Sequence, residues 1–142
     1  MPAEPTQARR FSKARVAQSH ALLEDYVELI DDLHAATGEA RPTDIARRLG
    51  VSHATVIKTI GRLKREGLAT SLPYRGVFLT HAGEHLAGKS RARHRLVVAV
   101  LTAIGVPPEA AEQDAEGLEH HISPATLRAF SAFLKKGGAG AG

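Results

Sequence analysis

The segment DAEGLEHHIS, residues 114–123, concentrates acidic and imidazole side chains that could bind a metal ion. If the segment is helical, Glu116, Glu119 and His120 are spaced i, i+3 and i+4, so their side chains project from one face. The chain has no cysteine, which excludes thiolate zinc sites and iron–sulfur clusters. Any bound metal ion must therefore be held by oxygen and imidazole ligands.

Two other parts of the sequence offer ligands of the same kind. Asp25 and Glu28 are spaced i, i+3 in a predicted helix, and His94 lies in a long predicted helix between them and the EGLEHH segment. Carboxylates and imidazoles without sulfur favour Mn(II) over Cu(I) or a structural tetrahedral zinc, and four carboxylates carry enough charge to hold two ions. The ordinary alternatives are a solvated acidic helix face and a histidine that belongs to the core or the surface.

The elements around these residues predict a mainly α-helical protein. Apolar residues recur at helical spacing from residue 22 to residue 33, and this first helix ends at Gly38. A short helix from Pro42 ends at Gly50, and Ser52 caps a third helix that ends at Gly67, which makes a helix-turn-helix. The stretch LATSLPYRGVFLT, residues 68–80, predicts a two-stranded hairpin, so the whole unit is a winged helix.

The remaining sequence predicts a second, helical domain. A long helix follows Thr80, and later helices begin at Pro107-Pro108 and after Ser123. The expected organisation is a flexible basic arm over residues 1–20, a winged helix-turn-helix DNA-binding domain over 21–80, a helical dimerisation and metal-binding domain over 81–136, and a disordered tail over 137–142. We expect a homodimer, because regulators of this size pair two copies about one DNA turn apart, roughly 34–36 Å.

The charge of the winged-helix segment predicts binding to double-stranded DNA. Residues 41–80 contain eight basic side chains and two acidic ones, although the net charge of the chain is only +4. A solvated basic surface is the ordinary alternative, and an aromatic content of 4% makes single-stranded RNA a poor partner. The predicted DNA contacts are Arg41, Ser52, His53, Thr55, Lys58, Thr59, Arg62 and Arg75.

Composition limits the location of the protein. No apolar run is long enough to span a membrane, and the first residues lack the apolar centre of a secretory signal. The expected location is the cytoplasm, without a membrane partner or an organic cofactor.

Five segments in order, LLEDYVELIDDL, DIARRLGVSHATVIKTIGRLKREGL, YRGVFLT, RARHRLV and DAEGLEHHIS, resemble the manganese-responsive regulators of the diphtheria-toxin-repressor family. The resemblance implies a winged-helix homodimer that binds operator DNA when loaded with Mn(II) and represses manganese uptake genes. It also implies a binuclear site formed by Asp25, Glu28, His94, Glu116, Glu119 and His120, with two ions per subunit. The chain ends too early for the SH3-like third domain of some relatives, which is therefore not expected.

Three alternatives remain open at the level of sequence. The iron-responsive branch of the family is similar but uses sulfur ligands at the positions of Asp25 and Glu116. A winged-helix regulator that responds to Fe(II) or to an organic effector would share the DNA-binding module. A binuclear metal hydrolase would share the ligand types, but no nucleophile motif or glycine-rich phosphate loop supports an enzyme.

Overall fold

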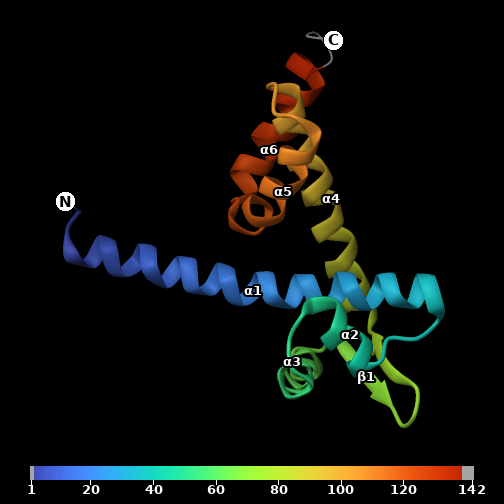
Figure 1. Ribbon diagram of the computed structural model, residues 1–142. Coiled ribbons are helices and arrows are strands. Elements are labelled where there is room, and N and C mark those ends of the chain that lie inside the picture. Colours follow the sequence, from blue (N-terminus) through green and yellow to red (C-terminus); the bar gives the residue numbers. More distant parts are fainter. Residues whose placement is uncertain (1, 139–142) are drawn as a thin grey trace. The chain divides into compact units, whose positions relative to one another are not determined.

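The computed structural model describes residues 2–138, most of which are helical (Figure 1). The main helices are α1 (Glu4–Thr37), α2 (Pro42–Leu49), α3 (His53–Arg65), α4 (His81–Ala103), α5 (Pro108–Leu118) and α6 (Pro124–Phe133). Short helical turns η1 (Glu119–His121) and η2 (Leu134–Gly138) follow α5 and α6, and the strands are β1 (Ala69–Leu72) and β2 (Gly76–Leu79). Among the described residues, none of the helices combines the length and apolarity needed to span a lipid bilayer.

The chain forms two compact units. One comprises residues 22–89, and the other combines the described parts of residues 1–21 and 90–142. The unit boundaries fall inside α1 and α4. Leu86 and Ala87 of α4 pack with the apolar core of residues 22–89, so the first turns of α4 belong to this unit.

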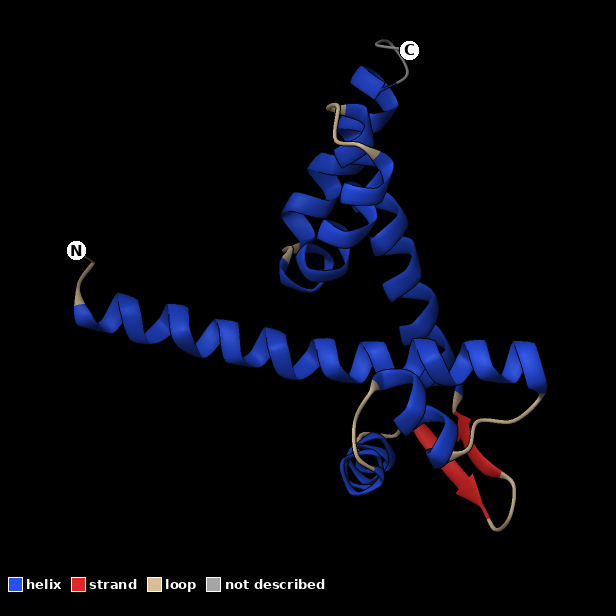
Figure 2. Cartoon of the chain, in the orientation of Figure 1, coloured by secondary structure: helices blue, strands red, loops and turns tan. Residues whose placement is uncertain are grey.

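The unit of residues 22–89 is a winged helix-turn-helix, as the sequence predicts. Gly50 ends α2 in the left-handed conformation with φ 69°, and the Ser52 hydroxyl accepts a hydrogen bond from the Thr55 backbone N–H at 3.1 Å to begin α3. The strands β1 and β2 pair antiparallel from Ala69 opposite Leu79 to Leu72 opposite Gly76, and they form the hairpin drawn in red in Figure 2. The buried core consists of Leu23, Tyr26, Val27, Ile30, Leu33, Ala40, Ile45, Val56, Ile60, Leu63, Ala69, Val77 and Ala87.

The second unit is helical. Val97 and Val100 of α4 and Ala111 and Ala115 of α5 are buried. Ser123 caps α6, where its hydroxyl accepts from the backbone N–H of Thr126 at 3.3 Å. This cap agrees with the helix start after Ser123 that the sequence predicts.

The N-terminal segment differs from the expected flexible arm. Residues 4–20 form the first part of α1 in one continuous helix. The segment contains no glycine, and its only proline is Pro5, in the first turn, so alanine, arginine and glutamine can extend the helix toward the N-terminus. At the other end, η2 includes Gly137 and Gly138, and residues 139–142 of the expected tail lie outside the described residues.

Candidate metal centre and DNA-contacting surface

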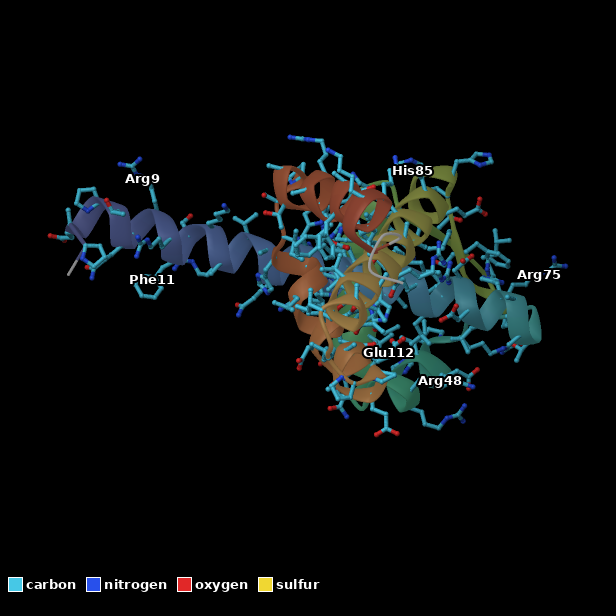
Figure 3. The ribbon with its side chains drawn as sticks, turned by 90° about the horizontal axis from the view of Figure 1, so that it is seen from above. Arg9, Phe11, Arg48, Arg75, His85 and Glu112 are labelled. Atoms are coloured by element: carbon cyan, nitrogen blue, oxygen red, sulfur yellow. The ribbon has the colours of Figure 1, made fainter. Side chains whose placement is uncertain are left out.

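A cluster of imidazole and carboxylate side chains lies where α4 meets the end of α5 and η1. His94 comes from α4, Glu112 from α5, and Glu119 and His120 from η1. The turn η1 directly follows α5. Glu112 of α5 and Glu119 and His120 of η1 are therefore close in space as well as in sequence. Glu112 is the residue of this cluster that is labelled in Figure 3, and it lies on α5.

The cluster is held by short polar contacts. His94 Nδ1 lies 2.5 Å from Glu119 Oε2, and His94 Nε2 lies 2.7 Å from Glu112 Oε2. The other oxygen of Glu119, Oε1, lies 3.3 Å from Nε2 of His120. Arg93 Nη1 donates to the backbone oxygen of Glu119 at 3.3 Å, which helps to fix η1 against α4. Glu119 is therefore the centre of the cluster.

Burial strengthens the electrostatic interactions between these side chains. The side chains of Glu119 and His120 are only 4% and 6% exposed, whereas that of His94 is 22% exposed. Burial alone would lower the pKa of His94, but its hydrogen bonds to Glu112 and Glu119 and the charges of these carboxylates raise the pKa above the usual value. A proton on His94 consequently places positive charge between the two carboxylates.

The donor chemistry fits a divalent metal ion. Imidazole nitrogen and carboxylate oxygen are ligands that Mn(II) accepts, and a cation can replace the proton that His94 shares with its carboxylate partners. Within residues 2–138, however, the side chains contact one another in a chain, and no group of three or more His, Asp or Glu donors is arranged as a ready metal site. His94 and Glu119 are thus a ligand pair bound to each other.

The six predicted ligands are only partly brought together. His94, Glu119 and His120 form the contacts described above, whereas Glu116 is exposed on α5. Asp25 is exposed and Glu28 half-buried on the part of α1 that belongs to the winged-helix unit. Their participation in one site with His94 stays a prediction.

Sequence reasoning missed Glu112. This residue precedes Glu116 by four positions and Glu119 by seven, so the three glutamates share one helix face. That spacing was available in the sequence as a signal. The structure adds the partner, because Glu112 binds the nitrogen of His94 that does not contact Glu119.

The winged-helix unit exposes a basic surface on α3 and the wing. Most of the predicted contact residues are exposed, and Arg75 points away from the ribbon in Figure 3. Ser52 is exposed but serves as the cap of α3, and Arg62 donates from Nε to Glu66 Oε2 at 3.0 Å. The exposed predicted residues are Arg41, Ser52, His53, Thr55, Lys58 and Arg75, with Arg62 half-buried.

One of the predicted DNA contacts needs correction, and another has partners within the protein. Thr59 is buried, and its hydroxyl donates to the backbone oxygen of Thr55 at 3.0 Å, because it lies on the core side of α3 next to Ile60. Arg41 is exposed, but its guanidinium is held by Glu39 and by the backbone oxygen of Tyr74. Thr59 is therefore buried on the core side of α3, contrary to the prediction, whereas Arg41 is exposed and has partners within the protein.

Two family profiles together match most of the described chain. Residues 20–77 match the family profile described as "Iron dependent repressor, N-terminal DNA binding domain". Residues 80–137 match the profile "Iron dependent repressor, metal binding and dimerisation domain". The first profile ends at residue 77 and the second begins at residue 80.

Individual relatives agree with these profiles. The chain is 51% identical over 136 residues to "Transcriptional regulator MntR" of Escherichia coli O157:H7, covering 96% of this chain and 88% of the relative. It is 41% identical over 101 residues to "HTH-type transcriptional regulator MntR" of Lysinibacillus sphaericus, covering 71% of this chain and 73% of the relative. A solved "Manganese-dependent transcriptional repressor complex with manganese" superposes with a TM-score of 0.70 at 28% identity over 80% of this chain, which spans about half (52%) of that solved chain.

Proposed function

The chain belongs to the iron-dependent repressor family of metal-dependent, DNA-binding transcriptional repressors, and we propose that Mn(II) is the ion to which it responds. The contact of His94 with Glu119 carries this proposal, because it joins two sulfur-free ligands at a buried position. The names of the MntR relatives and of the manganese-dependent repressor support the same ion. The proposed gene targets are those of manganese uptake.

The proposed ligands are the six residues of the sequence prediction, with up to two ions per subunit. When bound, Mn(II) supplies positive charge to a group of carboxylates that otherwise repel one another. Glu119 orients His94 and His120, and Glu112 holds the second nitrogen of His94. The ligands are Asp25, Glu28, His94, Glu116, Glu119 and His120.

The proposed regulation follows from where these ligands are carried. Asp25 and Glu28 belong to the winged-helix unit, whereas His94 and Glu119 belong to the second unit. Ligands shared by two units favour conformations in which both units are held in one arrangement. In a homodimer, holding the two units in one arrangement raises the fraction of molecules whose two α3 helices fit successive major grooves of operator DNA. A coupling of about 1–3 kcal/mol corresponds to roughly 5- to 150-fold in DNA affinity.

We further propose that the protein acts in the cytoplasm as a regulator rather than as an enzyme and needs no organic cofactor. The DNA-binding profile over residues 20–77 supports a regulatory role. The proposed homodimer is supported by the dimerisation profile over residues 80–137.

The direct test is DNA binding by chelator-treated protein with single metals added back. A duplex is first selected from a random pool with the Mn(II)-loaded chain, and its affinity is then measured with no metal, Mn(II), Fe(II), Co(II) or Zn(II). Binding should require metal and should fall to the metal-free level in Glu119→Gln, whereas Glu109→Gln, an exposed position on α5, serves as the matched control. Equal affinity with and without metal would refute the proposal, and activation by Fe(II) alone would assign the protein to iron.

A further inference from the structure

The guanidinium of Arg41 donates hydrogen bonds to one side chain and to one backbone oxygen within the protein. Its Nε donates to Glu39 Oε2 at 2.9 Å, and its Nη2 donates to Glu39 Oε1 at 3.2 Å, so the planar group meets both oxygens of one carboxylate. The same Nη2 also donates to the backbone oxygen of Tyr74 at 3.3 Å. Arg41 thus connects the segment before α2 with the turn between β1 and β2.

The base of the wing is fixed to the same segment. The backbone N–H of Val77 donates to the oxygen of Ala40 at 2.9 Å, and the ring of His34 lies with Nε2 2.7 Å from the oxygen of Val77. Gly76 has a φ of 83°, and a Cβ at this position would lie 2.5 Å from the oxygen of Ala40. These contacts hold β2 at its first residues, but none of them holds the turn itself.

The turn has a backbone conformation that needs support. Arg75 N–H donates to the oxygen of Leu72 at 3.1 Å, which closes a β-turn with Pro73 and Tyr74 at its centre. Tyr74 has a φ of 64°, in the left-handed region that non-glycine residues seldom adopt, and its residue surface is 95% exposed. No burial of the Tyr74 side chain stabilises this conformation. Its carbonyl, however, is the group that Arg41 binds.

We propose that Glu39 and Arg41 are positioning residues for the wing: Glu39 orients the Arg41 guanidinium, which holds the Tyr74 carbonyl and so presents Arg75 to a DNA phosphate. This inference rests on the proposed operator binding. It replaces the sequence prediction that Arg41 itself contacts phosphate.

The two roles of Arg41 predict opposite effects of Glu39→Gln. If Arg41 were a phosphate ligand, removal of the competing carboxylate would free the guanidinium and strengthen DNA binding. If Arg41 positions the wing, the same change weakens the support of the turn and reduces DNA affinity. The sign of the change therefore separates the two roles.

The experiment measures affinity of the Mn(II)-loaded full chain for the selected duplex over a range of salt concentrations. Glu39→Gln and Arg41→Gln should each weaken binding by about threefold to tenfold, the range expected for coupled neighbours. Arg75→Gln should reduce the slope of log affinity against log salt by about 0.9 for each phosphate that the wing no longer neutralises, and Glu39→Gln and Arg41→Gln, which act through Arg75, should reduce the slope by no more than Arg75→Gln does. In the Glu39→Gln background, Arg75→Gln should cost less than in the wild type, because Arg75 is already misplaced.

Asp44→Asn is the matched control, since it removes one carboxylate from a comparable exposed ion pair, with Arg47 Nη2 at 3.2 Å from Asp44 Oδ1. It should not weaken DNA binding. The proposal would be overturned if Glu39→Gln bound DNA more tightly, if Arg41→Gln reduced the salt slope further in the Arg75→Gln background, or if the effects of Glu39→Gln and Arg75→Gln were fully additive.

A second measurement does not depend on DNA. Amide hydrogen exchange at Arg75 should be faster in Glu39→Gln than in the wild type or Asp44→Asn, because the turn closed by its N–H is less supported. Unchanged exchange would contradict the positioning role. If the wild type bound no duplex in any metal state, the proposed function would fail, and exchange at Arg75 would still decide the role of Glu39.

Discussion

At the scale of single residues, Glu119 and Glu112 differ in burial and in the number of histidines that they contact. Glu119 is 4% exposed and contacts two histidines with its two oxygens, whereas Glu112 is 61% exposed and contacts His94 with one oxygen. An outer partner of a ligating histidine typically contributes 10- to 100-fold to metal affinity, and an exposed one belongs at the lower end. Glu119 should therefore matter more than Glu112 for Mn(II).

We predict that Glu119→Gln reduces Mn(II) affinity by more than about 100-fold, and Glu112→Gln by about tenfold. The amide of glutamine keeps the shape but loses the charge that binds the ion. Isothermal titration calorimetry of the metal-free proteins measures both values, with Glu109→Gln as control. An equal loss in the two variants would show that Glu112 is itself a ligand.

The raised pKa of His94 predicts a pH dependence of Mn(II) binding. Burial opposes the protonated form, but Glu112 and Glu119 outweigh it, so the pKa lies above the usual value for histidine. A ligating nitrogen must lose its proton, so Mn(II) affinity should fall as the pH decreases through this raised pKa, by up to about tenfold per pH unit for one proton. Affinities measured between about pH 5 and 8 test this.

Glu112→Gln provides the internal comparison for the pH experiment. It removes one of the groups that raise the pKa of His94, so the loss of affinity should begin at a lower pH. A flat profile in the wild type would contradict ligation by His94, and identical profiles would contradict the contribution of Glu112.

At the scale of elements, the start of α4 is packed tightly against the wing. A Cβ added at Gly83 would collide with the backbone oxygen of Leu68 and lie 3.2 Å from Cβ of Leu79. Gly88, five residues later in the same helix, would meet nothing within 4 Å. Close packing therefore requires a glycine at position 83 but not at position 88.

Gly83→Ala should destabilise the protein by about 1–3 kcal/mol, because backbone or helix must shift to avoid the collision. Gly88→Ala should stabilise it by about 0.5–1 kcal/mol, since alanine is the better helix former and has free space. Urea unfolding of the metal-free variants measures both. If both variants changed the free energy of unfolding by a similar amount in the same direction, the close packing of α4 against the wing would be contradicted.

The elements themselves could be predicted from local signals. Gly50 and Ser52 punctuate α2 and α3 as expected, because a left-handed glycine and a hydroxyl cap act within a few residues of the chain. The predicted DNA-facing position of Thr59 is wrong, because threonine suits either a core or a surface position and its residue type does not decide between them. The partners of Arg41 and of Glu112 could not be predicted, because each depends on a contact with a residue distant in sequence, Tyr74 and His94.

At the scale of the whole molecule, the proposed ligands are divided between two compact units. Asp25 and Glu28 are carried by α1 in the unit of residues 22–89, and His94, Glu116, Glu119 and His120 by the other unit. Spacing along a helix predicts which residues share a face, but it does not predict how two units are joined. The role of Mn(II) as a link between them must therefore be tested by coupling, not by binding alone.

We predict that Asp25→Asn separates metal binding from DNA binding. The cluster around His94 and Glu119 would still take up Mn(II), but fewer ligands of the winged-helix unit would share it, so the metal would restrict the two units less. The gain in DNA affinity on adding saturating Mn(II), roughly 5- to 150-fold in the wild type if the coupling is about 1–3 kcal/mol, should shrink several-fold. Asp31→Asn, a charge-matched change on the same helix, should retain the full gain in DNA affinity.

By reciprocity, operator DNA should tighten Mn(II) binding by the same factor as Mn(II) tightens DNA binding in each protein. If Asp25→Asn at saturating Mn(II) kept the full gain in DNA affinity, the ion would not act as a link through this residue.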